Sequence, residues 1–287
     1  MSDARDIHAS SAAARENPLA ATEEKLVGTM AGAFAPAFDR PGGELVRRAP
    51  TVIVPLTGTT AQMLVEEAQA AEAAGADVLE WRVDFMLATH KQLSFAPLGR
   101  EVVNPIVEAT SLPLLLTIRT SDQGGEAKLS TGRYRLLLAE MLDTLVHIDV
   151  PPERIAIDLE HWFDGTPALV QRAQERGFTV VLSHHDWQET PDSDIMQIVY
   201  EDMLELPGAV AKLAVMAHDD GDVQRLLDVT ARVAHSSGRA IIAIAMGEIG
   251  RRSRLEGWKY GSMATFATVG AGSAPGQPSV AELHAAL

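Results

Sequence analysis

The chain has no cysteine among its 287 residues. Disulfides, thiolate metal sites and cysteine nucleophiles are therefore excluded. Aromatic residues are also scarce, at 5% of the chain, so the core must consist mainly of Val, Ile, Leu, Met and Ala. An aliphatic core of this kind is typical of strands that helices cover on both faces.

Long apolar runs and an excess of positive charge are missing as well. No apolar segment approaches the length of a membrane span, and the first thirty residues lack the apolar stretch of a signal peptide. We therefore expect a soluble, cytoplasmic protein that does not bind membranes. The formal net charge of −15 argues against nucleic acid as a partner. A small anionic substrate would need a local cluster of arginines.

Three stretches of the chain differ in their pattern. Residues 1–22 are rich in Ala and Ser without a hydrophobic period, which predicts a mobile N-terminal tail. Residues 23–50 carry short apolar segments around a Pro- and Gly-containing middle, and we expect an N-terminal extension, either a hairpin or a plug that closes the main domain. Residues 51–287 show a regular pattern and are predicted to form one catalytic domain.

The region after Thr51 alternates short Val/Ile/Leu runs with longer amphipathic segments. Eight strands separated by helices predict the α/β class and a closed (β/α)8 barrel, the TIM-barrel architecture. A doubly wound open sheet is the alternative. It normally has a Gly-rich phosphate-binding turn after its first strand, and Thr57–Thr60 is not such a turn. The expected strands are Thr51–Leu56, Asp77–Trp81, Leu114–Ile118, Arg154–Leu159, Thr179–Ser183, Val210–Val215, Ala240–Ala245 and Met263–Val269.

Several helices have readable start signals. Thr60 and Ser130 are expected N-caps, because a hydroxyl there can accept from a free backbone N–H of the first turn. Thr166-Pro167 and Thr190-Pro191 each predict an N-cap followed by proline at the first helical position.

In a barrel of this kind the active site lies at the carboxyl ends of the strands. Side chains alternate between the two faces of a strand, so Glu80 and Arg82 share one face, and His184 and His185 point apart. One of the two histidines should face the barrel interior and the other the helices, which disfavours a metal site made from this pair. The other residues that end expected strands or follow them are Arg119, Asp158, Glu160, Asp186, Met246 and Arg254, and Lys212 lies inside the sixth expected strand.

Lys212 lies inside the apolar strand segment Ala209–Val215. A buried ammonium is costly unless it is paired or loses its proton. One interpretation is a structural ion pair with Asp158 or Glu160. The other is a neutral amine whose pKa is lowered by burial and by nearby arginines, and such an amine can form an imine with a carbonyl group. The strand alone leaves both open.

Three arginines, Arg82, Arg119 and Arg254, follow three different expected strands. Any one of them is equally consistent with a solvated surface residue. Three such cations in a chain with a net charge of −15 indicate a carboxylate substrate, because a guanidinium binds a carboxylate through two parallel hydrogen bonds. The small, polar segment Gly270–Gln277 is either an ordinary loop or a lid over the substrate.

An ordered set of short segments extends from about Val52 to the C-terminus. They are Glu80-Trp-Arg-Val-Asp84, Thr117-Ile-Arg-Thr120, Gly124-Gly125-Glu126, Ser183-His-His-Asp-Trp187, Ala211-Lys-Leu-Ala-Val-Met216, Ser253-Arg254, Gly261-Ser-Met-Ala-Thr-Phe266 and Ser273-Ala-Pro-Gly-Gln277. Their order and spacing resemble the type I 3-dehydroquinate dehydratases. These are lyases that convert 3-dehydroquinate to 3-dehydroshikimate in the shikimate pathway.

The resemblance implies a commonly dimeric barrel that needs neither metal nor cofactor. Lys212 matches the family's Schiff-base lysine, and His185 matches its general acid/base. Gln123, Asp158 and Ala274 are expected to support the site. The positions that match substrate-binding or pocket-lining residues of the family are Glu80, Arg82, Arg119, Arg254, Ser273, Gln277, Met246 and Phe266.

Gln123 departs from the family pattern, which often has Glu at this position as a partner of the catalytic histidine. A neutral amide can orient His185 but cannot stabilise its cation as a carboxylate would, so the departure predicts a lower pKa for His185. The resemblance gives no role to residues 1–30. It also leaves open whether the reaction serves aromatic amino-acid biosynthesis or quinate catabolism.

Two other functions remain as alternatives. A class I aldolase also forms a Schiff base with a lysine on a barrel strand, although no obvious Gly-rich phosphate turn follows the last two strands here. A catalytically silent barrel that only binds the ligand is the second alternative. The presence of both Lys212 and His185 disfavours it.

Overall fold

The structure, a computed structural model, describes residues 29–46, 49–90, 93–161, 163–270, 274 and 276–287. The tail expected over residues 1–22 lies outside this part of the chain. None of the helices described has the length and hydrophobicity needed to cross a membrane.

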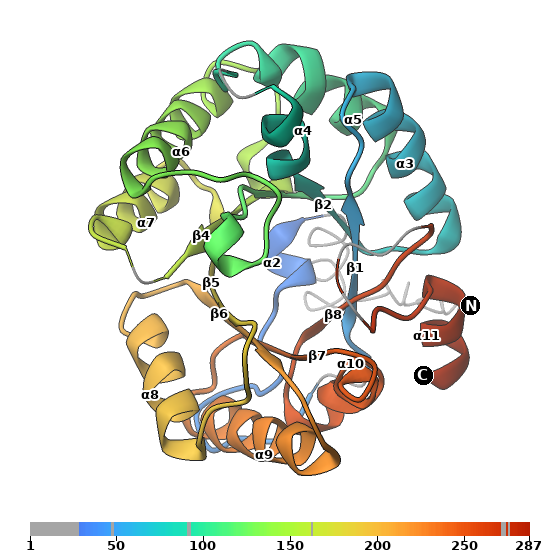
Figure 1. Cartoon of the computed structure of the whole chain (residues 1–287), viewed down its shortest axis with the longest axis vertical. Helices are drawn as coiled ribbons and strands as arrows, with labels where there is room; N and C mark the ends of the chain where they lie inside the picture. The colour runs from blue at the N-terminus through green and yellow to red at the C-terminus, as the bar shows by residue number, and fades with distance from the viewer. Residues whose placement is uncertain (1–28, 47–48, 91–92, 162, 271–273, 275) are drawn as a thin grey trace, which may run out of the picture.

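Eight parallel strands form a ring with helices around its outside (Figure 1). The strands are hydrogen-bonded in the order β7-β6-β5-β4-β3-β2-β1-β8. A bridge between Ile241 and Ser262 connects the two ends of this sheet, and the Met263 N–H donates to the Ile241 carbonyl at 2.8 Å. The predicted (β/α)8 barrel is therefore confirmed. The strands are β1 (Thr51–Leu56), β2 (Val78–Arg82), β3 (Leu114–Thr117), β4 (Ile155–Glu160), β5 (Thr179–Asp186), β6 (Val210–Met216), β7 (Ile241–Met246) and β8 (Ala264–Phe266).

Most of the helices lie between consecutive strands and cover the outer face of the barrel (Figure 1). The α-helices are α2 (Met30–Ala33), α3 (Ala61–Ala74), α4 (Val83–Thr89), α5 (Asn104–Ala109), α6 (Thr131–Leu145), α7 (Thr166–Gln174), α8 (Ser193–Leu204), α9 (Asp220–Ser237), α10 (Arg251–Glu256) and α11 (Val280–Ala286). Short helices of other types are η1 (Gly99–Val103), η2 (Ser121–Gln123), η3 (Pro152–Arg154) and η4 (Gly257–Tyr260).

The last strand is shorter than the sequence predicts. It ends at Phe266 rather than Val269, because Thr268 leaves the sheet and pairs with Ser279 just before α11. In contrast, β5 continues past Ser183 to Asp186, so that both histidines lie within the strand. The other strands agree with their expected bounds within one residue.

Two of the four expected helix starts are confirmed. Thr60 and Ser130 accept from the third backbone N–H of α3 and α6. The other two predictions are wrong. The N-cap of α7 is Gly165, whose φ of 99° favours glycine, and Thr166 is already helical. The N-cap of α8 is Asp192, since the Thr190 hydroxyl instead donates to the Met216 carbonyl.

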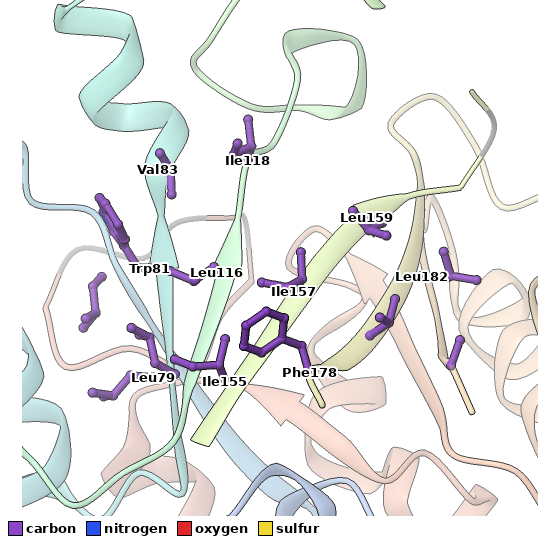
Figure 2. Close-up of a cluster of buried hydrophobic side chains, with 14 of the residues drawn as sticks. Leu79, Trp81, Val83, Leu116, Ile118, Ile155, Ile157, Leu159, Phe178 and Leu182 are labelled. Carbon is purple, nitrogen blue, oxygen red and sulfur yellow. The ribbon is translucent and has the colours of Figure 1, made fainter. Parts of the chain in front are cut away.

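Alternate strand residues pack under the helices. Figure 2 shows apolar side chains from neighbouring strands and the segments next to them meeting in one cluster. They are buried completely or nearly so, which explains why the strands read as continuous apolar runs. The labelled members are Leu79, Trp81, Val83, Leu116, Ile118, Ile155, Ile157, Leu159, Phe178 and Leu182.

The inward-facing residues change from apolar to polar along the strands. At the amino ends of the strands, apolar side chains such as Ile53 and Leu115 fill the barrel, and Met30 and Phe34 from the region of α2 pack against them. The Thr51 hydroxyl donates to the Ala33 carbonyl at 2.5 Å and attaches this segment to β1.

The division of the chain into tail, extension and catalytic barrel remains a prediction. Further along the strands, polar side chains from β2, β4, β5 and β6 take inward positions, beside the apolar Ala214, Ile244 and Met246, and together they form the site described next.

Candidate active site

A pocket of about 490 Å³, part of it open to solvent, lies over the carboxyl ends of the strands. Residues from β2, β5, β6, β7 and β8 line it, together with the loops after β3 and β8. Apolar side chains and several converging charged groups line it, which is typical of a small-molecule site. The lining residues are Glu80, Arg82, Arg119, Gln123, Gly124, His185, Trp187, Lys212, Ala214, Ile244, Met246, Arg254, Phe266, Ala274 and Gln277.

Lys212 lies on β6 and is only 4% exposed. Its Nζ is 3.4 Å from Oδ2 of Asp158 and 3.9 Å from Oε1 of Glu80, and it lies 4.4 Å from the centre of the Phe266 ring. Of the two carboxylates considered for an ion pair with Lys212, Asp158 lies beside the amine. The second neighbouring carboxylate is Glu80 instead of Glu160, because Glu160 binds Arg119 and Thr120.

The amine of Lys212 is held in a poor environment for a charge. Burial lowers its pKa, although Asp158 and Glu80 act in the opposite direction. Both distances to the carboxylates are longer than the 2.7–2.9 Å or so of a strong charge-assisted hydrogen bond. The amine is therefore more easily deprotonated than an exposed lysine.

Asp158 is completely buried and has a closer cationic partner than Lys212. Arg119 Nη2 donates to its Oδ1 at 2.7 Å, and the Ser183 hydroxyl donates to the same oxygen at 2.7 Å. Burial would raise the pKa of Asp158, but Arg119, Lys212 and the Ser183 hydroxyl outweigh it and lower that pKa. The carboxylate is thus ionised below the pocket.

Arg119 and Arg82 are both engaged with carboxylates of the chain. Arg119 Nη1 lies 3.3 Å from Oε1 of Glu160 in addition to its contact with Asp158. Arg82 donates two hydrogen bonds to Asp84, at 2.8 and 2.7 Å. Much of their positive charge is therefore neutralised within the protein, which the sequence pattern of three arginines did not predict.

Arg254 reaches the pocket from α10 and is 2% exposed. Burial lowers its pKa to about 10. A carboxylate bound beside this guanidinium would stabilise its charged form. Ala274 and Gln277 line the same pocket, whereas the expected Ser273 lies outside the described residues, as do 271, 272 and 275 of the expected lid.

His185 lines the pocket and is oriented by Gln123. The Oε1 atom of Gln123 lies 3.1 Å from the His185 backbone N and 3.2 Å from its Nδ1. The backbone N–H can only donate, so the atom that faces it is the amide oxygen. That oxygen can only accept, which places the proton of the neutral ring on Nδ1 and leaves Nε2 as the basic nitrogen.

Positive neighbours keep the His185 ring neutral. Burial lowers the pKa of His185 well below its ordinary value, and the charges of Arg119 and Lys212 act in the same direction. His184 does not line the pocket, and the charges acting on it include Asp186 and His161. In the described part of the chain, no group of three or more His, Asp or Glu side chains is arranged to hold a metal ion.

The structure adds residues to which the sequence gave no role. Thr117 donates to Glu80 at 2.8 Å, and Ser183 contacts both Asp158 and Arg119. Strand parity could have placed both hydroxyls inside the barrel, since Thr117 is two residues before Arg119 and Ser183 two before His185. Trp187 lies directly against Gly124, where an added Cβ would come within 2.0 Å of the indole ring. No sequence pattern indicates that contact.

Comparisons with known proteins bear on this site. A family model described as type I 3-dehydroquinase matches residues 52–287. The 3-dehydroquinate dehydratase of Salmonella paratyphi B is 36% identical over 245 residues, covering 83% of this chain and 92% of that protein.

Solved structures with related sequences have the same fold. The 3-dehydroquinate dehydratase from Geobacillus kaustophilus superposes with a TM-score of 0.73 at 27% identity, over 83% of this chain and 90% of that chain. The type I 3-dehydroquinate dehydratase from Clostridium difficile, solved with covalently modified comenic acid, has a TM-score of 0.70 at 30% identity and covers 84% of this chain and 92% of its own.

The match includes the whole barrel and most of each relative's length. The predicted reaction class, a hydro-lyase of the 3-dehydroquinate dehydratase type, is confirmed with it. The chain belongs to the type I 3-dehydroquinase family.

Proposed function

We propose that this chain converts 3-dehydroquinate to 3-dehydroshikimate and water through an imine on Lys212, with His185 as general acid/base. The observation that carries the proposal is the buried amine of Lys212, which has a lowered pKa and lies in the same pocket as a neutral histidine. An amine that attacks a carbonyl must be unprotonated, and a lowered pKa increases the share of the amine in that form.

The first stage forms the imine. The Lys212 nitrogen attacks the C3 ketone of the substrate to give a carbinolamine, which loses water. His185 carries the protons that this step requires, through its free Nε2 atom. The cationic imine then withdraws electrons from the neighbouring C2 position and makes its hydrogen more acidic than in the ketone.

The second stage is the elimination. His185 accepts the C2 proton, the C2–C1 double bond forms, and the C1 hydroxyl leaves as water with a proton that His185 returns. A second water molecule then hydrolyses the imine and releases the conjugated ketone and the free amine. One water is lost on imine formation and one is consumed on hydrolysis, so the net product is the single water of dehydration.

The substrate's carboxylate is assigned to Arg254. Arg82 and Arg119 line the same pocket and also bind carboxylates of the chain. Arg254 carries a charge that burial disfavours, and a bound carboxylate offsets that cost. Glu80 and Gln277, which also line the pocket, are assigned to the substrate's hydroxyl groups.

A covalently modified ligand in a related enzyme supports the assignment of a nucleophile in this family. The Clostridium difficile enzyme was solved with covalently modified comenic acid. The family resemblance also supports a cytoplasmic homodimer that acts in the shikimate pathway or in quinate breakdown. Both uses require the same dehydration.

Replacing Lys212 by alanine is expected to abolish turnover while preserving the fold, because Asp158 keeps its contacts with Arg119 and Ser183. Product formation is followed by absorbance, and folding by thermal unfolding. Lys259, an exposed lysine paired with Glu256, provides the control, and its alanine variant should match the wild type. Near-normal turnover of Lys212→Ala would rule out the imine.

His185→Ala is expected to slow the reaction roughly 100- to 10,000-fold.

Replacing Arg254 by methionine is expected to raise KM at least about tenfold, since a hydrogen bond between charged groups contributes roughly 1.5–3 kcal/mol. Steady-state kinetics with 3-dehydroquinate measure it. Arg251→Met is the control, because Arg251 is on the same helix but pairs with Glu282. An unchanged KM for Arg254→Met would remove Arg254 from the carboxylate site.

Replacing Gln123 by glutamate is expected to raise the pKa of His185 by about one to two units, because a carboxylate stabilises the imidazolium cation. His185 would then become protonated at a higher pH, so the low-pH loss of activity should also begin at a higher pH. An NMR titration of the His185 ring measures the pKa. Gln171→Glu adds the same charge on exposed α7 and should leave it unchanged. An unaltered His185 pKa in Gln123→Glu would contradict this interpretation.

A further inference from the structure

Ser183 is a completely buried hydroxyl at the centre of the charged layer of the barrel. The strand register places it beside Glu160 on β4 and beside Lys212 on β6. Its hydroxyl donates to Asp158 Oδ1 at 2.7 Å and accepts from Arg119 Nη1 at 2.9 Å. Ser183 therefore connects the acid and the guanidinium that lie next to the amine without lining the pocket itself.

The two oxygens of Asp158 have different surroundings. Oδ1 accepts two short hydrogen bonds, from Arg119 and Ser183, both at 2.7 Å. Oδ2 faces Lys212 Nζ at 3.4 Å, which is long for an ion pair between buried groups. The contacts at Oδ1 thus determine how closely the carboxylate approaches the amine.

We propose that Ser183 is a positioning residue that keeps the Asp158 carboxylate turned toward Arg119, and so leaves the Lys212 amine weakly paired and able to give up its proton. This inference rests on the proposed role of Lys212 as the nucleophile. It assigns to Ser183 no contact with the substrate.

The charged groups around Lys212 come from several strands. Asp158 on β4 and Glu80 on β2 favour the ammonium, and Arg119 after β3 opposes it. His185 on β5 lies close enough to Lys212 for the ammonium charge to act on it, after burial and Arg119, in lowering the pKa of His185.

The remaining sides are apolar. Ile244 on β7 and Phe266 on β8 line the pocket beside the amine. Of the two nearby carboxylates, Asp158 is the closer one, so a change in its orientation has the larger effect on Lys212.

Removal of the Ser183 hydroxyl would leave Asp158 Oδ1 with one strong donor fewer. The negative charge of the carboxylate is then less compensated by hydrogen bonds and attracts the Lys212 ammonium more strongly. The distance between Asp158 Oδ2 and Lys212 Nζ should become shorter. A closer carboxylate favours the ammonium form, so the pKa of Lys212 rises. The amine would consequently lose its reactivity at a higher pH than in the wild type.

The test measures the ionisation of Lys212 directly on the full chain. Acetic anhydride reacts only with neutral amines, and peptide mass spectrometry reports how much of Lys212 is acetylated at each pH. For Ser183→Ala we expect the midpoint of Lys212 labelling to move up by roughly one pH unit, the effect of a nearby charge. The activity of this variant should fall most at low pH and approach the wild-type value at high pH.

Two variants serve as controls. Ser183→Thr retains the hydroxyl and is expected to restore the wild-type midpoint. Ser262→Ala removes another buried hydroxyl, which hydrogen-bonds to the backbone of Ala243 and Ala264, and should leave the Lys212 midpoint unchanged. If thermal unfolding shows that Ser183→Ala does not fold, Ser183→Cys replaces it, and its weakly donating thiol is expected to shift the midpoint in the same direction.

An unchanged or lowered midpoint in Ser183→Ala, or an equal loss of activity at every pH, would overturn the proposal and make Ser183 a packing residue. The labelling requires no substrate. A shifted midpoint in an enzyme that failed to dehydrate 3-dehydroquinate would therefore support the role of Ser183 while contradicting the proposed function.

Discussion

Asp158 is the carboxylate on which the buried charges of this barrel depend. It lies between two cations, Arg119 at 2.7 Å and Lys212 at 3.4 Å, and it is completely buried. Without it, two positive groups would lie in the barrel with much less compensation, which is among the most destabilising arrangements in a protein interior. Asp158 lies closer to Arg119 than to Lys212. Because of this difference in distance, the barrel holds an ionised carboxylate next to an amine that loses its proton more easily than an exposed lysine.

The barrel provides this arrangement because successive side chains of each strand point alternately inward and outward. Apolar residues fill the inner positions at the amino ends of the strands, where Met30 and Phe34 also pack. Polar residues take many of the inner positions further along, while the outer positions remain apolar under the helices (Figure 2). The helices and the lower layer thus exclude water from Lys212 on every side but the pocket, and that exclusion lowers its pKa.

The sequence predicts the parts of this structure that depend on local periodicity. Strand alternation predicted that His184 and His185 point apart, and the strand ends pointed to about half of the pocket residues. The family resemblance, rather than periodicity, assigned Lys212 and His185 to the site. Partners from distant strands could not be predicted in this way. Glu80 approaches Lys212 across the barrel, and Glu160 binds Arg119 instead. Thr166 and Thr190 had the expected cap sequence, but the Thr166 hydroxyl donates to the Phe163 carbonyl three residues earlier, and the Thr190 hydroxyl donates to the Met216 carbonyl on β6. The contacts of Glu80, Glu160 and Thr190 join distant parts of the chain, so local periodicity does not predict them.

The most direct test of the central claim is chemical trapping at Lys212. The protein is incubated with 3-dehydroquinate and borohydride, which reduces an imine to a stable amine, and peptide mass spectrometry locates the adduct. We expect a reduced adduct on Lys212, and the absorbance of the conjugated product in samples without borohydride. Product formation without any adduct on Lys212, or an adduct on another lysine, would contradict the account.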